Sequence, residues 1–175
     1  MDFETQAEVP IDNYLQMIRY KTAVLVGAAL QMGAIVVGAS LNDQKLLYHF
    51  GEKIGLAFQL QDDYLDVFGD ETFGKRIGGD IIENKKTILY LKALALADTQ
   101  QRQALKQHYT TTEDSEAKIA AVKVLFEATG AAQAVRQEIA HITDEALELL
   151  PKLTIGEEKR RYLEDFAIGL MGRKI

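Results

Sequence analysis

The chain has 175 residues, of which 47% are hydrophobic, and its 20 basic and 26 acidic residues give a formal net charge of −6. This length and apolar content suit one domain with a hydrophobic core, and they exclude a disordered tail. The negative charge argues against a protein that coats nucleic acid, and the absence of cysteine excludes disulfides and thiolate metal sites and fits the reducing cytoplasm.

Apolar residues recur with the spacing of an α-helix through the whole chain, and no long segment alternates with period two. Both prolines, Pro10 and Pro151, lie between the periodic segments. The pattern predicts an all-α fold, with helices over residues 12–40, 43–68, 86–97, 99–109, 115–128, 131–150 and 155–171. The spacing from Thr154 to Glu157 predicts a capping box at the last helix. No internal repeat or linker divides the chain, so we expect a single domain over residues 1–175.

A run of 19 consecutive uncharged residues, from 23 to 41, begins inside the first predicted helix and is close to the length needed to cross a bilayer. Its many alanines and glycines and the central Gln31 lower its hydropathy. We therefore expect a buried core helix that packs closely against its neighbours, and no transmembrane span.

Lys21 precedes the run, in the interior of the bundle or at its edge. A buried lysine needs a negatively charged partner, which a diphosphate or an aspartate of a facing helix would supply equally well.

The second predicted helix ends in a cluster of three carboxylates, Asp62, Asp63 and Asp66. Because an α-helix turns by about 100° per residue, Asp62 and Asp66 lie on one face and Asp63 lies on its flank. Three carboxylates in one turn repel one another unless a cation binds them, and magnesium prefers such oxygen ligands together with substrate phosphates. A solvated acidic patch would have the same spacing. The apolar residues around the cluster favour fixed carboxylates, and therefore a magnesium site.

A glycine-rich segment, residues 69–80, and a basic segment follow the acidic helix. Glycine allows the backbone to approach a ligand closely, although a surface connection would have a similar composition. Lys75 and Lys85 could neutralise a diphosphate that also contacts the metal, although each alone could be an ordinary surface lysine. A nucleotide-binding phosphate loop is excluded, because Arg76 stands where such a loop needs serine or threonine. No register through the acidic cluster has the ligand pattern of an EF-hand.

Four motifs in order resemble those of the trans-type polyprenyl diphosphate synthases, which include farnesyl, geranylgeranyl and longer-chain synthases. The motifs are Lys21-Thr22-Ala23, Phe58-Gln59-x-x-Asp62-Asp63-x-x-Asp66, Gly74-Lys75-x-x-Gly78-x-Asp80 and Asn84-Lys85-Lys86-Thr87. The resemblance implies the C-terminal half of an isoprenoid-synthase-type helical bundle around a central cavity, usually in a homodimer. It also implies a prenyltransferase that joins isopentenyl diphosphate head to tail to an allylic diphosphate, with Mg²⁺ as cofactor. A terpene cyclase fits the lysine and glycine segments less well.

The resemblance implies a role for each matched residue. The metal ligands would be Asp62, Asp63 and Asp66. The catalytic residues would be Lys21, Thr22 and Gln59. The substrate-binding residues would be Phe58, Lys75, Asp80, Lys85, Arg173 and Lys174. Among the catalytic residues, Thr22 and Gln59 would lie beside the allylic cation, because a carbocation needs polar oxygens nearby but no strong nucleophile to trap it.

The sequence contains no second D-D-x-x-D, so the family's first aspartate-rich motif is absent from it. In the family, Met1-Asp2-Phe3 would fall in the middle of the protein. We therefore expect a fragment that is inactive alone, because departure of the diphosphate needs metals held from both walls of the cavity. The alternative is a non-catalytic helical partner or regulatory subunit of a separate prenyltransferase. Retention of every matched motif argues against that alternative.

Overall fold

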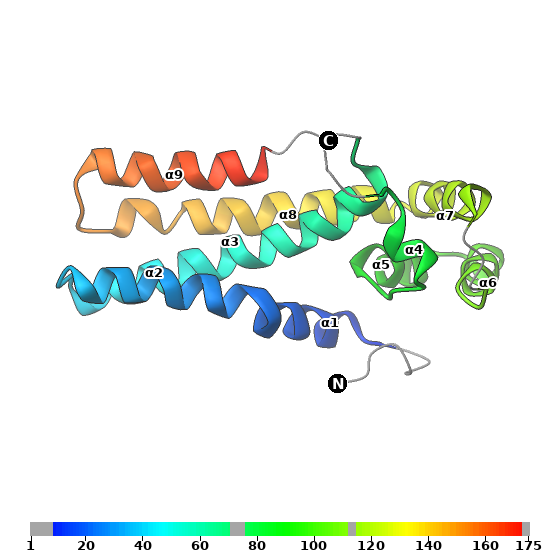
Figure 1. Ribbon diagram of the computed structural model, residues 1–175, viewed down its shortest axis with the longest axis horizontal. Coiled ribbons are helices and arrows are strands. Elements are labelled where there is room, and N and C mark those ends of the chain that lie inside the picture. Colours follow the sequence, from blue (N-terminus) through cyan, green and yellow to red (C-terminus); the bar gives the residue numbers. More distant parts are fainter. Residues whose placement is uncertain (1–8, 71–75, 112–114, 173–175) are drawn as a thin grey trace. The chain divides into compact units, whose positions relative to one another are not determined.

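The computed structural model describes residues 9–70, 76–111 and 115–172, and every regular element in these ranges is a helix (Figure 1). The elements are α1 (Ile11–Ile18), a π-helical turn (Arg19–Ala23), α2 (Val24–Val36), α3 (Leu41–Phe68), α4 (Gly79–Ile82), α5 (Ile88–Leu96), α6 (Thr99–His108), α7 (Glu116–Ala128), α8 (Ala131–Leu147), a 3₁₀ turn (Leu150–Lys152) and α9 (Glu157–Met171). The predicted all-α fold is confirmed. The short α4 was not predicted, and the first predicted helix is interrupted by the π-helical turn.

Contacts within the chain define two compact units. Of the described residues, unit 1 contains 9–14 and 62–137, and unit 2 contains 15–61 and 138–172. The helices α3 and α8 each continue from one unit into the other. The expectation of a single domain stays a prediction.

Each unit has its own buried apolar residues. In unit 2 they come from α3, α8, α9 and the 3₁₀ turn with the residue after it, and they are Phe50, Ile54, Ala146, Leu150, Leu153 and Ala167. The helix α9 folds back along α8 after this turn (Figure 1). In unit 1 the fully buried side chains include Ile81, Ile88, Leu89, Leu105, Val122 and Phe126. Removal of this apolar surface from water is the main favourable contribution to folding.

The helix α2 differs from the buried core helix that was predicted. Its buried residues are the small Gly27 and Ala34, whereas Leu25, Met32 and Val36 are 70%, 57% and 85% exposed. The prediction was wrong because an uncharged run has no polar face that marks the side turned toward solvent. None of the described helices is long and apolar enough to cross a membrane, as expected.

Glycines bring α2 and α3 into close contact within unit 2. A Cβ atom at Gly51 would lie 2.9 Å from the Cα of Gly27 and 2.9 Å from the carbonyl oxygen of Val26. At Gly27, a Cβ atom would lie 2.7 Å from the carbonyl oxygen of Tyr48. Distances this short leave no room for a side chain, so the expected close packing through small residues is confirmed.

Local hydrogen bonds end α2 and begin α3. Gly38 has a φ of +69° and occupies the left-handed position of a Schellman motif, in which the Ala39 N–H donates to the carbonyl oxygen of Ala34 (3.0 Å). The Ser40 hydroxyl then caps α3 by accepting a hydrogen bond from the Asp43 N–H (3.1 Å). The first predicted helical segment therefore ends earlier than its apolar pattern suggested.

Asp43 connects the start of α3 to the turn before α9. Its side chain is 3% exposed and accepts hydrogen bonds from the Thr154 N–H (2.9 Å) and from the Thr154 hydroxyl. These bonds lower the pKa of Asp43, with the hydroxyl contributing most. The predicted capping box of Thr154 and Glu157 is wrong, because Gly156 is the N-cap of α9 and no side chain caps that helix.

We expect Asp43 to contribute to the loss of stability in acid. Because its pKa in the folded chain lies below the unfolded value of about 3.9, its contribution is present above that pH and is lost as the pH falls through the folded value. Thermal unfolding followed by circular dichroism should show a smaller acid-induced decrease of Tm in Asp43→Asn than in the wild type. Asp144→Asn, at an exposed position of α8, is the control. An unchanged decrease in Asp43→Asn would contradict the assignment.

Candidate functional site

The acidic cluster lies at the C-terminal end of α3, in unit 1. Leu65 and Val67 are each 1% exposed, and their burial fixes the rotation of the helix. With this rotation Asp63 and Asp66 are buried, at 6% and 9% exposure, whereas Asp62 is half-buried. The predicted placement on one helix is confirmed, and the three carboxylates differ in their access to solvent.

A buried tyrosine holds Asp63. The hydroxyl of Tyr14, which is 5% exposed, donates a hydrogen bond to Asp63 Oδ2. Burial raises the pKa of Tyr14, and the negative charge of Asp63 raises it further. The hydroxyl therefore keeps its proton and remains a donor at neutral pH. Sequence reasoning missed Tyr14, because it precedes Asp63 by 49 residues and belongs to none of the four motifs.

The end of the glycine-rich segment is bound to Asp66. The Asp80 N–H donates to Asp66 Oδ2 (3.0 Å), and the Gly78 N–H donates to the Asp66 carbonyl oxygen (2.6 Å). Gly78 has a φ of +80°, and a Cβ atom there would lie 2.7 Å from Cγ2 of Ile119. Glycine is therefore required by the backbone conformation and by the close approach to α7. In the described part of this segment, the glycine backbone therefore packs closely against another part of the protein, the side chain of Ile119.

Lys85 is paired with two carboxylates of its own turn. Its Nζ lies 2.9 Å from Asp80 Oδ1 and 2.6 Å from Glu83 Oε2. These contacts, with Glu83 contributing most, raise the pKa of Lys85, so its ammonium group stays charged. The structure thus connects three of the predicted site residues by successive contacts. Asp66 contacts Asp80, and Asp80 contacts Lys85.

Asn84, in the basic segment, adopts a left-handed backbone conformation with a φ of 55°. Its side-chain amide donates to the carbonyl oxygen of Thr111 (3.0 Å) and accepts from Nζ of Lys118 (2.7 Å). Lys118 is only 4% exposed and also donates to the Thr111 carbonyl oxygen (2.8 Å). Asparagine suits this place because it tolerates positive φ better than most residues and its amide satisfies a buried ammonium group. The sequence had indicated Asn84 only as part of a motif.

The three catalytic candidates, Lys21, Thr22 and Gln59, lie in unit 2. Lys21 and Thr22 belong to the π-helical turn, in which the Val24 N–H donates to the Arg19 carbonyl oxygen. The Thr22 hydroxyl donates to Gln59 Oε1 on α3 (3.0 Å). Lys21 is exposed, which favours the edge of the bundle over its interior. Turns of this kind are frequent at functional sites.

Gly55 on α3 allows the π-helical turn to lie close to α3, since a Cβ atom at Gly55 would lie 2.8 Å from Cα of Ala23. Phe58 lies on α3 and is half-buried. The candidates Lys75, Arg173 and Lys174 lie outside the described residues.

The donor set of the acidic cluster consists of carboxylate oxygens, which are the ligands that magnesium prefers. Among the described residues, no group of three acidic or histidine side chains is placed to hold a metal ion by itself. A metal at α3 would therefore need further ligands, and magnesium commonly takes them from water and substrate phosphates.

Solved structures similar to this chain are isoprenyl diphosphate synthases. A crystal structure of a geranylgeranyl pyrophosphate synthase is 48% identical, with a TM-score of 0.92, and the match covers 99% of this chain and 55% of that one. A polyprenyl synthase from Caulobacter crescentus CB15, complexed with calcium and isoprenyl diphosphate, is 31% identical, with a TM-score of 0.88, over 97% of this chain and 52% of that one. The fold of the described residues is therefore the all-helical fold found in isoprenyl diphosphate synthases.

Sequence comparison identifies the family to which the chain belongs. The polyprenyl synthetase family model matches residues 1–126. A short chain isoprenyl diphosphate synthase from Methanothermobacter thermautotrophicus is 37% identical over 173 residues, which are 96% of this chain and 52% of the relative. The chain belongs to the polyprenyl synthetase family, and the resemblance found from the motifs is confirmed. The chain spans about half the length of the curated relatives that it matches.

Proposed function

We propose that this chain supplies the second aspartate-rich motif of a prenyltransferase that joins isopentenyl diphosphate head to tail to an allylic diphosphate. In this reaction the allylic C–O bond breaks, inorganic diphosphate leaves with the bonding electrons, the isopentenyl double bond attacks the allylic carbon, and a proton is lost. The observation that carries the proposal is the acidic end of α3, where internal donors fix two of the three carboxylates. Membership of the polyprenyl synthetase family supports it.

We infer that the three aspartates divide their work. Asp62 is the most accessible of them and is the candidate for direct contact with magnesium. Asp63 and Asp66 accept hydrogen bonds from Tyr14 and from the Asp80 backbone, so their orientation is set before a ligand binds. Bound magnesium would neutralise charge on the departing diphosphate. The calcium and isoprenyl diphosphate bound to the Caulobacter crescentus relative support a metal-dependent diphosphate site.

The other candidate residues keep their proposed roles. Thr22 and Gln59 form a polar pair without a strong nucleophile, which suits a position beside an allylic cation. For Phe58 we propose contact with the isopentenyl group. For the diphosphates we propose contacts with Lys21, Lys75, Asp80, Lys85, Arg173 and Lys174. Lys85 would have to leave Asp80 or Glu83, or share them, to contact a phosphate oxygen.

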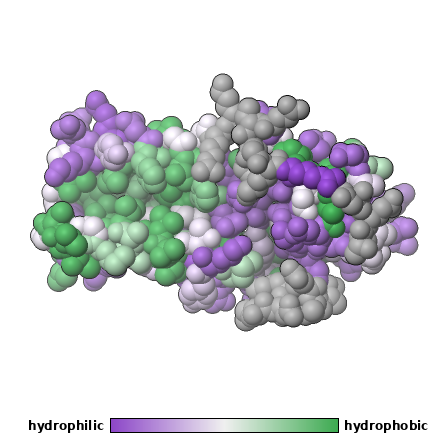
Figure 2. Space-filling view, viewed as in Figure 1, coloured by the Kyte–Doolittle hydropathy of each residue, from purple (hydrophilic) through white to green (hydrophobic). Residues whose placement is uncertain are grey.

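The exposed apolar side chains of α2 support a homodimer. Leu25, Met32, Val36 and, just after the helix, Val37 are all more than half exposed, and Figure 2 shows hydrophobic surface gathered over this part of the molecule (left). Large exposed apolar patches mark interaction sites in soluble proteins. A second copy of the chain is the partner that we propose for this helix.

Binding of an allylic diphosphate tests the proposal. We expect isothermal titration calorimetry to detect binding of dimethylallyl diphosphate to the chain that requires Mg²⁺. Asp62→Asn should weaken this binding by at least about tenfold, because a direct ligand loses its charge. Asp144→Asn, exposed on α8, removes the same charge elsewhere and should bind like the wild type. Wild-type affinity in Asp62→Asn would rule out Asp62 as the direct ligand, and an absence of Mg²⁺-dependent binding would overturn the site.

Turnover should behave differently from binding. The sequence has one D-D-x-x-D, whereas metals on both sides of the leaving diphosphate are needed for its departure. With Mg²⁺, isopentenyl diphosphate and dimethylallyl diphosphate, we expect the 175-residue chain to release no inorganic diphosphate above the background rate. Steady release at the rate of a synthase, measured with a coupled diphosphate assay, would show that one motif suffices.

A further inference from the structure

The helix α7 contacts both ends of the segment that carries Asp80, one of the proposed diphosphate contacts. At the first end, a Cβ atom on Gly78 would lie 2.7 Å from Cγ2 of Ile119, so the backbone packs directly on that side chain. At the other end, Nζ of Lys118 donates to Oδ1 of Asn84 (2.7 Å). Lys118 and Ile119 are consecutive residues in the first turn of α7, so a single helical turn contacts the segment at both ends.

Lys118 completes a cycle of hydrogen bonds with Asn84 and Thr111. Its Nζ donates to the carbonyl oxygen of Thr111 (2.8 Å), and the side-chain amide of Asn84 donates to the same oxygen (3.0 Å). The three residues come from different parts of the chain, yet each contacts the other two. Asn84 has a φ of 55°, and a non-glycine residue stays in this left-handed conformation where its surroundings fix it.

The helix α7 alone does not explain a lysine at position 118. Lys118 is the third residue of α7, where the helix dipole disfavours a positive charge. It is also only 4% exposed, and an ammonium group taken out of water costs free energy unless polar groups surround it. The hydrogen bonds to Asn84 and Thr111 offset this cost. A lysine is therefore retained here for the contacts that it makes outside its own helix.

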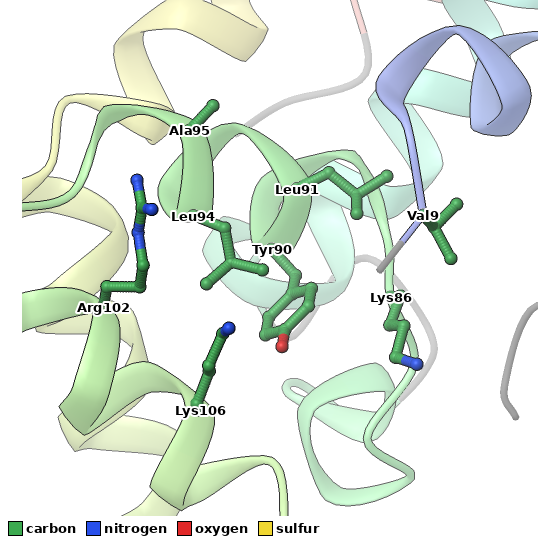
Figure 3. Close-up of a pocket in the computed structure, with 8 residues that line it drawn as sticks. All are labelled: Val9, Lys86, Tyr90, Leu91, Leu94, Ala95, Arg102 and Lys106. Atoms are coloured by element: carbon green, nitrogen blue, oxygen red, sulfur yellow. The ribbon is translucent and has the colours of Figure 1, made fainter. Parts of the chain in front are cut away.

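The ring of Tyr109 connects the same ammonium group to α5. Nζ of Lys118 lies 6.0 Å from the centroid of this ring, which stacks on the ring of Tyr90 with 4.0 Å between centroids. Figure 3 shows Tyr90 extending from α5 into the cavity between α5 and α6, with Lys86 on one side of its ring. Lys86 directly follows Lys85 in the chain. The aromatic stack thus ties the start of α5 to the contacts of Lys118.

From Asn84 the contacts continue to the acidic cluster. Lys85 directly follows Asn84, and its N–H donates to the carbonyl oxygen of Asp80 (2.9 Å) while its Nζ lies 2.9 Å from Asp80 Oδ1. The Asp80 N–H donates to Asp66 Oδ2 (3.0 Å). A change at Lys118 would therefore alter the backbone of Asn84 first, and with it the direction of Lys85.

We propose that Lys118 is a positioning residue of the prenyltransferase site, which acts through Asn84 to hold Lys85 where it can contact the diphosphate. Ile119 supports the other end of the same segment, at Gly78. A side chain that is already in place loses less conformational freedom when the ligand binds, so its contact contributes more to affinity. The inference rests on the proposed function, because it needs a diphosphate at the acidic end of α3.

Binding of dimethylallyl diphosphate with Mg²⁺, measured by isothermal titration calorimetry, tests the inference. Lys118→Met keeps the length of the side chain and removes its ammonium group, and it should bind about tenfold more weakly, the lower end of the range for loss of a residue that orients a ligand. Asn84→Gly still permits the left-handed backbone and should show a similar loss. Circular dichroism should show both variants to be folded.

Lys159→Met is the matched control, because Lys159 is the third residue of α9, as Lys118 is of α7, and is exposed. It removes the same charge and should bind like the wild type. A folded Lys118→Met protein that binds as tightly as Lys159→Met would show that Lys118 serves stability alone, and would overturn the inference.

A double-mutant cycle separates positioning from a direct effect of the charge of Lys118. Lys85→Met should weaken binding by at least about tenfold, since it removes the proposed phosphate contact itself. If Lys118 acts through Lys85, then Lys85→Met/Lys118→Met should bind no more weakly than Lys85→Met. Losses that add up in the double variant would mean that Lys118 acts on the ligand by itself, and would overturn the inference.

Hydrogen exchange of the amides of Asp80 and Lys85 tests the positioning without a ligand. Both N–H groups donate within the segment or to the acidic cluster, so they should exchange at least about tenfold faster in Lys118→Met, with no change in α9. Unchanged exchange at both amides would overturn the inference. Faster exchange together with a wild type that shows no Mg²⁺-dependent binding would instead confirm the positioning and overturn the prenyltransferase site.

Discussion

Replacing Tyr14 with phenylalanine is expected to weaken the Mg²⁺-dependent binding of dimethylallyl diphosphate by about 10- to 100-fold, the range typical for loss of an outer-shell partner. The Tyr14 hydroxyl donates to Asp63, and both side chains are buried. A hydrogen bond to a carboxylate is about twice as strong as a neutral one, and it fixes the direction of the acceptor. Without it, Asp63 loses a donor that holds it for a ligand. Isothermal titration calorimetry measures the change.

Tyr20→Phe is the matched control, because Tyr20 lies on the adjoining π-helical turn and is 65% exposed. It should bind like the wild type. Because the raised pKa of Tyr14 keeps the hydroxyl protonated, the ratio between Tyr14→Phe and the wild type should stay constant from about pH 6 to pH 9. A folded Tyr14→Phe protein with wild-type affinity would show that this hydrogen bond does not support the site.

A second large effect is expected at Gly51, where alanine should lower the free energy of unfolding by about 1–2 kcal/mol. The added Cβ would lie 2.9 Å from two backbone atoms of α2, so the helices must move apart. Overpacking of this kind costs about 1–3 kcal/mol, and the better helix propensity of alanine returns about 0.5–1 kcal/mol. Urea denaturation followed by circular dichroism measures the difference.

Gly33→Ala provides the opposite result on the same pair of helices. Gly33 lies inside α2, and no atom lies within 4 Å of the position that its Cβ would take. Alanine there should raise the free energy of unfolding by about 0.5–1 kcal/mol through propensity alone. Equal stabilisation by Gly51→Ala and Gly33→Ala would mean that α2 and α3 do not pack as closely as the structure has them.

The helical fold could be predicted because its signal is local and repeated along the chain. Apolar periodicity located every long helix, and the errors lie at their ends. Gly38 ends α2 by a left-handed conformation, which glycine composition alone does not indicate. Thr154 has the spacing of a cap, yet its hydroxyl is bound to Asp43, which precedes it by 111 residues. Partners so far apart leave no trace in a local pattern.

The candidate site shows the same limit. Spacing placed Asp62, Asp63 and Asp66 on one helix, and order along the chain related them to the family's motifs. The sequence pattern did not reveal that the Tyr14 hydroxyl donates to Asp63, because Tyr14 is one of seven tyrosines and its neighbours in the sequence do not distinguish it. Nor could the apolar run distinguish the buried side of α2 from its exposed side, because both sides lack charge.

The π-helical turn sets the register of the first helical segment. Ile18 and Ala23 are buried, at 1% and 0% exposure, and they are five residues apart. In an α-helix five steps of about 100° would put them on different faces, roughly 140° apart, whereas the wider π turn brings residues five apart onto one face. The turn thus acts as a one-residue insertion that the fold retains. Deleting one residue between Arg19 and Ala23 would restore regular α-helix with Ile18 and Ala23 four residues apart, roughly 40° from each other, so both would stay on the buried face. A further inserted residue would instead add about 100° and turn Ile18 away from the face that Ala23 occupies.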